Sequence, residues 1–277
     1  MDLWYVAAAL LSAVLHAGWN AAVKARPKPS EAMTAQMVLS ALIGLPGLLW
    51  TGLPAQGSWI WIGSSTAMNL VTVIALLRAY DLVGFGTAYP VVRALSVLLV
   101  VPLAAAVSGE QLSFFGLIGV ALVVVSLLLL AIGSSHGAVP RAALLWIAIA
   151  GLSAAAYVMS DAQGVRRAGS PIAYGLVVGF TNALAMSIWR GAVAQPIRMV
   201  REHALAALPI AVASTVSYLL ILWVFRHAPI APAAALRDTS SIFAVVIAVI
   251  WLKEPFTPLR LFAILLSAAA VPLLRLS

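Results

Sequence analysis

The sequence of 277 residues contains no cysteine, and this absence removes several classes of structure and site. Without thiols there is no disulfide framework, no cysteine-ligated metal site and no cysteine nucleophile. Charged residues are also scarce, at 9% of the chain, and only 8 residues are acidic. A soluble domain needs more polar residues than this to cover its surface, so the composition excludes a soluble protein.

Several marks of enzymes and of nucleic-acid-binding proteins are missing as well. The chain has no HExxH sequence, and its four histidines are scattered along it. It also lacks a Walker sequence, so ATP does not drive its activity directly. Runs of basic residues interleaved with aromatic residues are absent, which argues against nucleic acid as a partner. A membrane-embedded enzyme would need a nucleophile, a metal site or paired carboxylates. We therefore expect no enzyme and no cofactor.

The chain consists instead of long apolar runs, because 64% of its residues are hydrophobic. A helix of about 20 such residues crosses the hydrocarbon core of a bilayer. Ten runs of this kind predict an all-α integral membrane protein whose solvent is the lipid bilayer. The expected helices are Leu3–Val23, Glu31–Trp50, Trp59–Tyr80, Gly84–Val107, Leu112–Ile132, Ala142–Ala162, Pro171–Trp189, Ala204–Phe225, Ile230–Leu252 and Thr257–Leu274.

A segment with the Gly, Ser and Pro of a linker, residues 133–141, separates five expected helices from the next five. The chain is therefore expected to hold two units, residues 1–132 and residues 142–277. Because five is an odd number, the second unit must enter the bilayer from the opposite side, which makes the two units inverted repeats. Such symmetry is typical of secondary transporters, whose substrate sites lie near the bilayer midplane.

A stretch that occurs twice, at residues 82–116 and 226–260, supports the repeat. Each copy is an apolar helix with one arginine near its start and an acidic residue at its end, and the ungapped alignment pairs Arg93 with Arg237, Ser96 with Ser240, and Glu110 with Glu254. An arginine inside a membrane helix costs roughly 2.5–3.5 kcal/mol on insertion scales. This cost at two matching places favours arginines that face a shared interior. The alternative is that both side chains reach lipid headgroups.

Other polar residues repeat the same order. His16 and Asn20 lie one turn apart on the first expected helix, and Tyr157 and Asp161 have the same spacing on the sixth. Structural roles are the alternatives to substrate binding. They are hydrogen bonds between packed helices, an Asp161 at the membrane interface, and a local ion pair between Arg237 and its neighbour Asp238. The candidate substrate-binding residues are His16, Trp19, Asn20, Asn69, Tyr89, Arg93, Tyr157, Asp161, Tyr218, Arg237, Asp238 and Ser240.

These residue types suit a zwitterion. An arginine binds a carboxylate through two parallel hydrogen bonds. Tyrosine and tryptophan rings offer aromatic faces to an apolar side chain or an ammonium group. An aspartate, either Asp161 or Asp238, could pair with an amine. An amino acid would satisfy all three features, and the same set could also hold a phosphonate, a quaternary amine or a nucleotide-sugar fragment.

The layout carries a resemblance to a known family. Ten helices in two halves, with the sequences GEQLSFFGLIGVALV and KEPFTPLRLFAILL after the repeated stretch, resemble the drug/metabolite transporter superfamily and its EamA-type members. In length and layout the chain is similar to amino acid exporters of the YddG type. The resemblance implies a secondary transporter that exports small metabolites, above all amino acids, across the cytoplasmic membrane. It also implies alternating access through a central cavity between the repeats. A carrier for a quaternary amine, a phosphonate or a drug-like compound is the alternative.

Two criteria for orientation disagree. The positive-inside rule favours a N-terminus outside the cell, because that orientation places the more basic loops in the cytoplasm. These loops carry Lys24, Arg26, Lys28, Arg190, Arg198 and Arg201, against Arg166, Arg167 and Arg226 on the other side. The resemblance implies cytoplasmic termini, and that is our expectation; an even number of helices puts both termini on one side. We also expect a monomer, because the two halves already supply the inverted pair.

Overall fold

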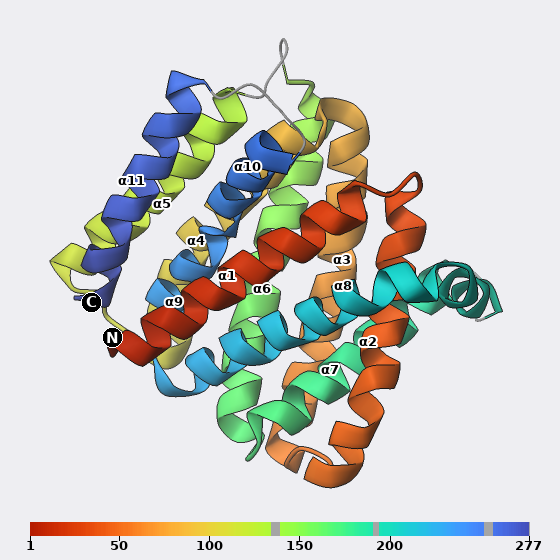
Figure 1. The fold of residues 1–277 in the computed structure, drawn as a ribbon. Helices are drawn as coiled ribbons and strands as arrows, with labels where there is room; N and C mark the ends of the chain where they lie inside the picture. The colour runs from red at the N-terminus through yellow and green to blue at the C-terminus, as the bar shows by residue number, and fades with distance from the viewer. Residues whose placement is uncertain (134–138, 191–193, 252–256, 277) are drawn as a thin grey trace.

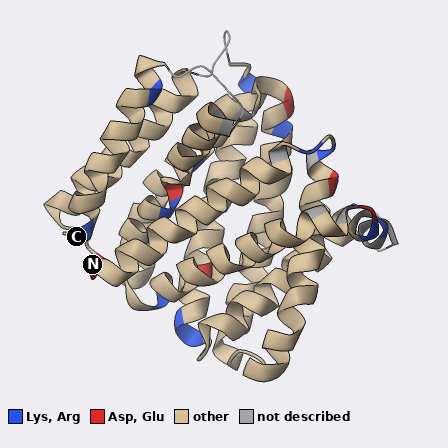
Figure 2. Cartoon of the chain, viewed as in Figure 1, with Lys and Arg blue, Asp and Glu red and all other residues tan. Residues whose placement is uncertain are grey.

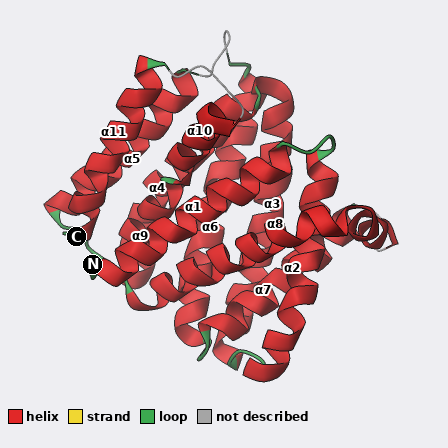
Figure 3. Cartoon of the chain, in the orientation of Figure 1, coloured by secondary structure: helices red, strands yellow, loops and turns green. Residues whose placement is uncertain are grey.

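The computed structural model describes residues 1–133, 139–190, 194–251 and 257–276, and its described residues form helices joined by short connections (Figure 3). Ten spans in this part of the chain are long and apolar enough to cross a membrane. The predicted fold class, an all-α integral membrane protein with ten transmembrane helices, is therefore confirmed. The described residues contain no β-strand.

The helices follow one another in the order shown in Figure 1. The first half contains α1 (Leu3–Lys24), α2 (Pro29–Thr51), a 3-10 turn (Gln56–Ser58), α3 (Trp59–Val83), α4 (Phe85–Ser108) and α5 (Phe114–Ile132). The second half contains α6 (Arg141–Arg167), α7 (Pro171–Trp189), α8 (Ala194–His227), α9 (Ile230–Asp238), α10 (Ser240–Trp251) and α11 (Pro258–Arg275).

Helix boundaries follow local sequence signals. The hydroxyls of Ser113, Ser170 and Thr257 cap the first turns of α5, α7 and α11 by accepting a hydrogen bond from the backbone three residues on. A proline in the first turn of α7 and α11 costs little, because its missing N–H has no intrahelical partner there. At the C-terminal end of α4, Gly109 adopts a left-handed conformation with φ of 66°, which stops the helix just before Glu110.

Three expected boundaries were wrong. The expected helix Ile230–Leu252 is interrupted at Thr239, which separates α9 from α10. The expected loop between residues 190 and 203 is helical from residue 194, where an ion pair of 3.7 Å between Arg198 and Glu202 links successive turns. α6 runs on to Arg167, and the polar residues after Ala162 bond to other helices: Gln163 donates to Ser108 of α4, and Arg166 donates to the carbonyl of Phe225 in α8. Leu252 and Glu254 lie outside the described residues.

The two halves interlock rather than sit side by side (Figure 1). α3, the third helix of the first half, packs along α6, the first helix of the second half. In the same way, α1 packs along α8, the third helix of the second half. α2 contacts both α7 and α8, while α4 contacts α6 and α1 contacts α9 and α10. α5 and α11, the last helices of the two halves, pack against each other. Every side of the interior is therefore built from both halves.

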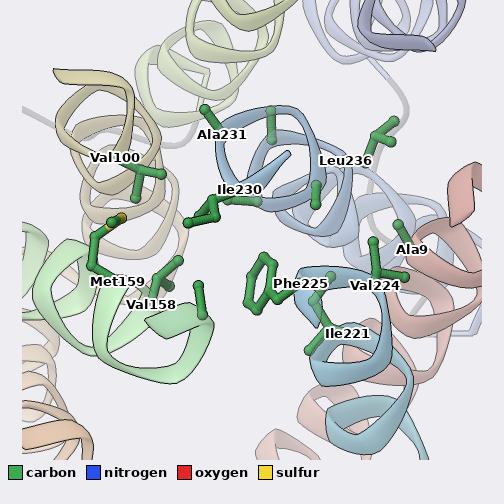
Figure 4. Packing of buried hydrophobic residues seen from close by; sticks show 14 of the residues in the cluster. Ala9, Val100, Val158, Met159, Ile221, Val224, Phe225, Ile230, Ala231 and Leu236 are labelled. Carbon is green, nitrogen blue, oxygen red and sulfur yellow. The ribbon is translucent and has the colours of Figure 1, made fainter. Parts of the chain in front are cut away.

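A dense apolar cluster fills one end of this interior. It joins α4, α6, α8 and α9 through side chains that include Val100, Val158, Ile221, Phe225 and Ile230 (Figure 4). Phe225 and Ile230 are 1% and 0% exposed, so both side chains are enclosed by their neighbours. The polar site described below lies beyond the cluster.

Both chain termini lie at the end of the bundle that holds this cluster. The amino group of Met1 donates a hydrogen bond of 2.6 Å to the carbonyl oxygen of Arg275. We call this the terminal end, and we call the end that contains the α1–α2 connection the opposite end. Figure 2 shows that most charged residues lie near the ends of helices and in connections, with few between them. Charged side chains in the interior are therefore worth examining one by one.

Candidate functional site

A cavity of about 380 Å³ lies among α1, α2, α3, α4, α6, α7, α8 and α9. Ten of the twelve candidate residues line it, although they come from six different helices. These ten are His16, Trp19, Asn20, Asn69, Tyr89, Arg93, Tyr157, Asp161, Tyr218 and Arg237. Asp238 and Ser240, the other two candidates, are buried residues outside the set that lines the cavity.

The cavity extends toward the opposite end of the bundle. Its lining includes Val23 in the last turn of α1, Ser30 in the first turn of α2 and Tyr80 in the last turn of α3. These three turns lie together at the opposite end. Tyr157 belongs to the apolar cluster and also lines the cavity, whereas Val100, Val158, Ile221, Phe225 and Ile230 lie outside the lining. The site is thus reached from one end of the bundle and blocked at the other.

Asp161 is the buried acid of the cavity, with 2% of its surface exposed. Its Oδ1 accepts hydrogen bonds from the hydroxyls of Ser65 at 2.6 Å and Tyr174 at 3.3 Å. Its Oδ2 accepts one from the hydroxyl of Tyr218 at 2.9 Å. The alternative of an interfacial Asp161 is wrong, because α6 continues for six residues beyond it to Arg167. Within the described part of the chain, no cationic side chain forms an ion pair with this carboxylate.

Arg93 is held by groups from several helices. Its Nη1 donates to Oδ1 of Asp238 at 3.3 Å and to the hydroxyl oxygen of Tyr157 at 3.4 Å. Its Nη2 lies 3.4 Å from Nε2 of His16. The guanidinium also sits 5.1 Å from the centre of the Tyr89 ring, a cation–π arrangement. Arg93 therefore has an ion pair, a hydrogen bond and an aromatic neighbour within the protein.

Arg237 has none of these contacts. It is 7% exposed and lines the cavity, yet in the described structure no residue forms a hydrogen bond or an ion pair with it. The suggested local pair with Asp238 is wrong. Adjacent residues on a helix point about 100° apart, so Asp238 reaches across to Arg93 on α4 while Arg237 faces the cavity.

Some polar lining residues were not anticipated. Gln36 and Ser40 lie one turn apart on α2, where Gln36 donates to Ser40 at 2.9 Å and Ser40 donates to the carbonyl of Ala211 at 3.2 Å. Their spacing matches that of His16 and Asn20, so the same search applied to the second helix would have found them. Thr215 and Asn182, from α8 and α7, each present a buried oxygen without a partner among the described residues.

The interruption between α9 and α10 is also polar. Arg237 and Asp238 end α9, the hydroxyl of Thr239 donates to the carbonyl of Leu236 at 2.6 Å, and Ser240 and Ser241 begin α10. Broken membrane helices of this kind occur where transporters bind substrates or ions. The run of hydroxyl residues directly after a charged pair was the sequence signal for the break.

The side chains do not form a metal site in the part of the chain that the structure describes. No group of three or more His, Asp or Glu residues there is arranged to hold a metal ion. The chemistry available in the cavity is therefore hydrogen bonding, charge pairing and contact with apolar and aromatic groups.

Comparisons with known proteins agree with this architecture. Residues 141–276 match the EamA-like transporter family. The chain also matches 29 chains of solved structures, and one crystal structure aligns over 98% of this chain and 95% of its own with a TM-score of 0.73. The two sequences are 16% identical, so this likeness shows the fold alone. No curated protein sequence matches.

Proposed function

Because this chain belongs to the EamA-like transporter family through residues 141–276, we propose that it is a secondary transporter that carries amino acids across the cytoplasmic membrane. The observation that supports the substrate is a pair of opposite charges in one cavity. Arg237 and Asp161 both line it, and neither forms an ion pair with the other or with another described residue. A zwitterion supplies the missing partner of each.

Arg237 is proposed to bind the substrate carboxylate. A buried charge without a counterion is costly, so a carboxylate that pairs with the guanidinium removes a destabilising feature of the empty site. The planar guanidinium offers two parallel N–H groups to the two carboxylate oxygens. Arg93, which already pairs with Asp238, is less available for this role.

Asp161 is proposed to bind the substrate ammonium group. A carboxylate has about four lone-pair positions, and three of those of Asp161 are taken by hydroxyl donors. These hydroxyls fix the orientation of the carboxylate without neutralising its charge. One acceptor position of the carboxylate remains, and an α-ammonium group supplies a cationic donor for it.

The rest of the cavity suits the side chain of the substrate. Trp19, Met33, Met37, Leu76 and Leu77 add apolar and aromatic surface on the part of the lining near the opposite end. A volume of about 380 Å³ lies within the usual range of about 300–1,000 Å³ for small-molecule sites. Methionine side chains adapt to ligands of different shape, which favours a carrier that accepts several side chains.

We further propose that residues 1–132 and 142–277 are inverted repeats that rock against each other, so that the cavity alternates between the two faces of the membrane. The reciprocal packing of α1 on α8 and of α6 on α3 supports this proposal. A single chain then contains both repeats and works as a monomer. Coexpressed active and inactive copies should give transport in proportion to the active fraction, and strong dominance by the inactive copy would contradict a monomer.

We propose from the family layout that the carrier exports its substrate and that its termini are cytoplasmic; the cavity in this structure then faces the outside. The distribution of basic residues favours the reverse orientation, because Arg78 and Arg260 also lie toward the opposite end, in addition to the basic residues of the loops there. A reporter fused after Ser277 resolves the question. Activity confined to the exterior of the cell would reverse the orientation and would make this structure the state open to the cytoplasm.

The function is tested with purified protein in liposomes. Uptake of labelled amino acids, amines and phosphonates is measured with and without unlabelled substrate trapped inside. Faster uptake of a labelled amino acid into preloaded vesicles is the expected result, because a carrier exchanges substrate across the membrane. Flux of amines or phosphonates alone would contradict an amino acid carrier, and chemical conversion of the substrate without flux would indicate an enzyme.

A further inference from the structure

A second polar cluster, separate from the cavity, lies at the terminal end of the bundle. Its centre is an ion pair of 2.9 Å between Glu110, in the connection between α4 and α5, and Arg166, in the last turn of α6. Both side chains are partly buried, at 18% and 28% exposed. The pair joins the first half of the chain to the second.

Each member of the pair also binds the backbone where α8 meets α9. Arg166 donates from Nε to the carbonyl of Phe225 and from Nη2 to the carbonyl of Ala228, each at 2.9 Å. Glu110 accepts a hydrogen bond of 2.6 Å from the backbone N–H of Ile230, the first residue of α9. A carboxylate at a helix start satisfies a free N–H and lies at the positive end of the helix dipole.

The local backbone brings Glu110 close to α9 and Arg166. Gly109 ends α4 in a left-handed conformation, so Glu110 leaves the helix axis and reaches α9. Beside it, Gln163 of α6 donates to Ser108 of α4 at 2.5 Å, and Arg167 donates to Gln163. The ends of α4 and α6 are thus tied to the α8–α9 junction directly over the apolar cluster that blocks the cavity.

The opposite end has a different arrangement. The described ion pairs there are Lys28–Glu31 and Arg198–Glu202. Each joins two residues that are three or four positions apart in the sequence. The cavity extends toward this end, and it stops short of the terminal end, where Glu110 and Arg166 join the two halves.

We propose that Glu110 and Arg166 form a latch that holds the terminal end shut in this state and that separates each time the carrier turns over. The proposal rests on the transport function proposed above. When the latch parts, α9 loses its N-terminal cap and the α8–α9 junction can move away from α4 and α6. The cavity then reaches the terminal end, while the helices at the opposite end close over it.

Thiol labelling tests whether the latch controls access. The chain has no cysteine, so Ala231→Cys introduces a single reporter on α9 beneath the latch, at a residue that is 2% exposed. Glu110→Gln keeps an acceptor for the N–H of Ile230 but removes the charge that Arg166 needs. Combined with the reporter, it should raise the rate of maleimide labelling by about fivefold or more, because the open population grows.

The matched control is Glu31→Gln with the same reporter. It removes the local ion pair with Lys28 at the opposite end, and it should leave the labelling rate unchanged. Equal labelling in the Glu110→Gln and control proteins would overturn the latch. Arg166→Gln removes the positive charge and repeats the test from the other partner, so a folding failure of one variant does not leave the question open.

Reversible cross-linking tests whether the latch must part. Glu110→Cys combined with Arg166→Cys places two thiols at the latch, and a cleavable bifunctional thiol reagent joins them. The cross-linked carrier should lose at least about nine-tenths of its flux and recover it on reduction, because alternating access requires the two states to interconvert. It should still bind substrate from the opposite end.

The outcomes separate this inference from the proposed function. Undiminished flux in the cross-linked carrier would overturn the latch and leave transport standing. Absence of amino acid flux in the unmodified protein would instead count against the proposed function, and the labelling comparison would still report whether Glu110 and Arg166 hold the terminal end shut.

Discussion

Arg93 and Arg237 occupy matching places in the repeated stretch, but the fold treats them differently. Both are buried, at 9% and 7% exposed. Arg93 contacts Asp238, Tyr157, His16 and Tyr89, whereas Arg237 has no hydrogen bond or ion pair with any described residue. A repeat therefore shows where two arginines are placed and does not show that they do the same work.

The difference comes from a single acid. Asp238 follows Arg237 in the sequence and has no counterpart beside Arg93, where the next residue is Ala94. Because the helix turns Asp238 away from its own neighbour, that acid neutralises the arginine of the other half. Arg93 holds α4 to α9 through this ion pair, and Arg237 is the arginine that we propose binds a ligand.

Removing the counterion of Arg93 should have the largest effect on stability. Asp238→Asn leaves Arg93 without its counterion inside the protein, which should destabilise the fold by about 3 kcal/mol or more. The measurement is the fraction of monodisperse protein that survives heating in detergent. The double variant with Arg93→Gln should be more stable than Asp238→Asn alone, because no buried charge is then unpaired; equal loss in both would contradict the ion pair.

Removing the acid that faces Arg237 across the cavity should affect transport more than stability. Asp161→Asn keeps an oxygen that accepts from Ser65 and Tyr174, and its NH2 group can donate to the hydroxyl oxygen of Tyr218, so the protein should fold. It lacks the charge that pairs with the substrate ammonium. We expect initial flux of a zwitterionic amino acid to fall tenfold or more, about 1.4 kcal/mol. Normal flux with unchanged stability would remove Asp161 from the site.

A charged pair on the surface should have the smallest effect and serves as the reference for both variants. Arg198→Gln breaks the exposed pair with Glu202 at the start of α8. Exposed pairs of this kind contribute about 0.3–0.5 kcal/mol on a helix. Stability and flux should both stay within the error of the wild type, and a large loss of flux would give this segment a role that its contacts do not indicate.

The sequence predicted the helices and most of the lining residues because both depend on local patterns. Apolar length defined the ten spans, and the four-residue spacing of His16 with Asn20 and of Tyr157 with Asp161 placed each pair on one face. Symmetry between the halves then suggested that these faces meet. The lining role of α2 was missed because Gln36 and Ser40 have no obvious match in the repeat.

The charge pairing was not predictable in the same way. Which arginine receives Asp238 depends on the rotation of α9 against α4, a property of the packed bundle rather than of either helix. The contacts of Glu110 with Arg166 and Ile230 likewise join segments that are far apart in the sequence. Their use in binding and in closure therefore stays a prediction until flux and labelling are measured.

The most direct test of the account compares Arg237→Lys with Arg93→Lys in proteoliposomes at matched protein, with thermal stability in detergent as the control. Lysine keeps the charge but loses the planar fork that binds a carboxylate at two points. We predict that Arg237→Lys folds normally and loses tenfold or more of its initial flux, about 1.4 kcal/mol, while Arg93→Lys keeps more flux and loses more stability. Near-normal flux in Arg237→Lys, or a greater loss of flux in a stable Arg93→Lys, would contradict the assignment of Arg237 as the arginine that binds substrate.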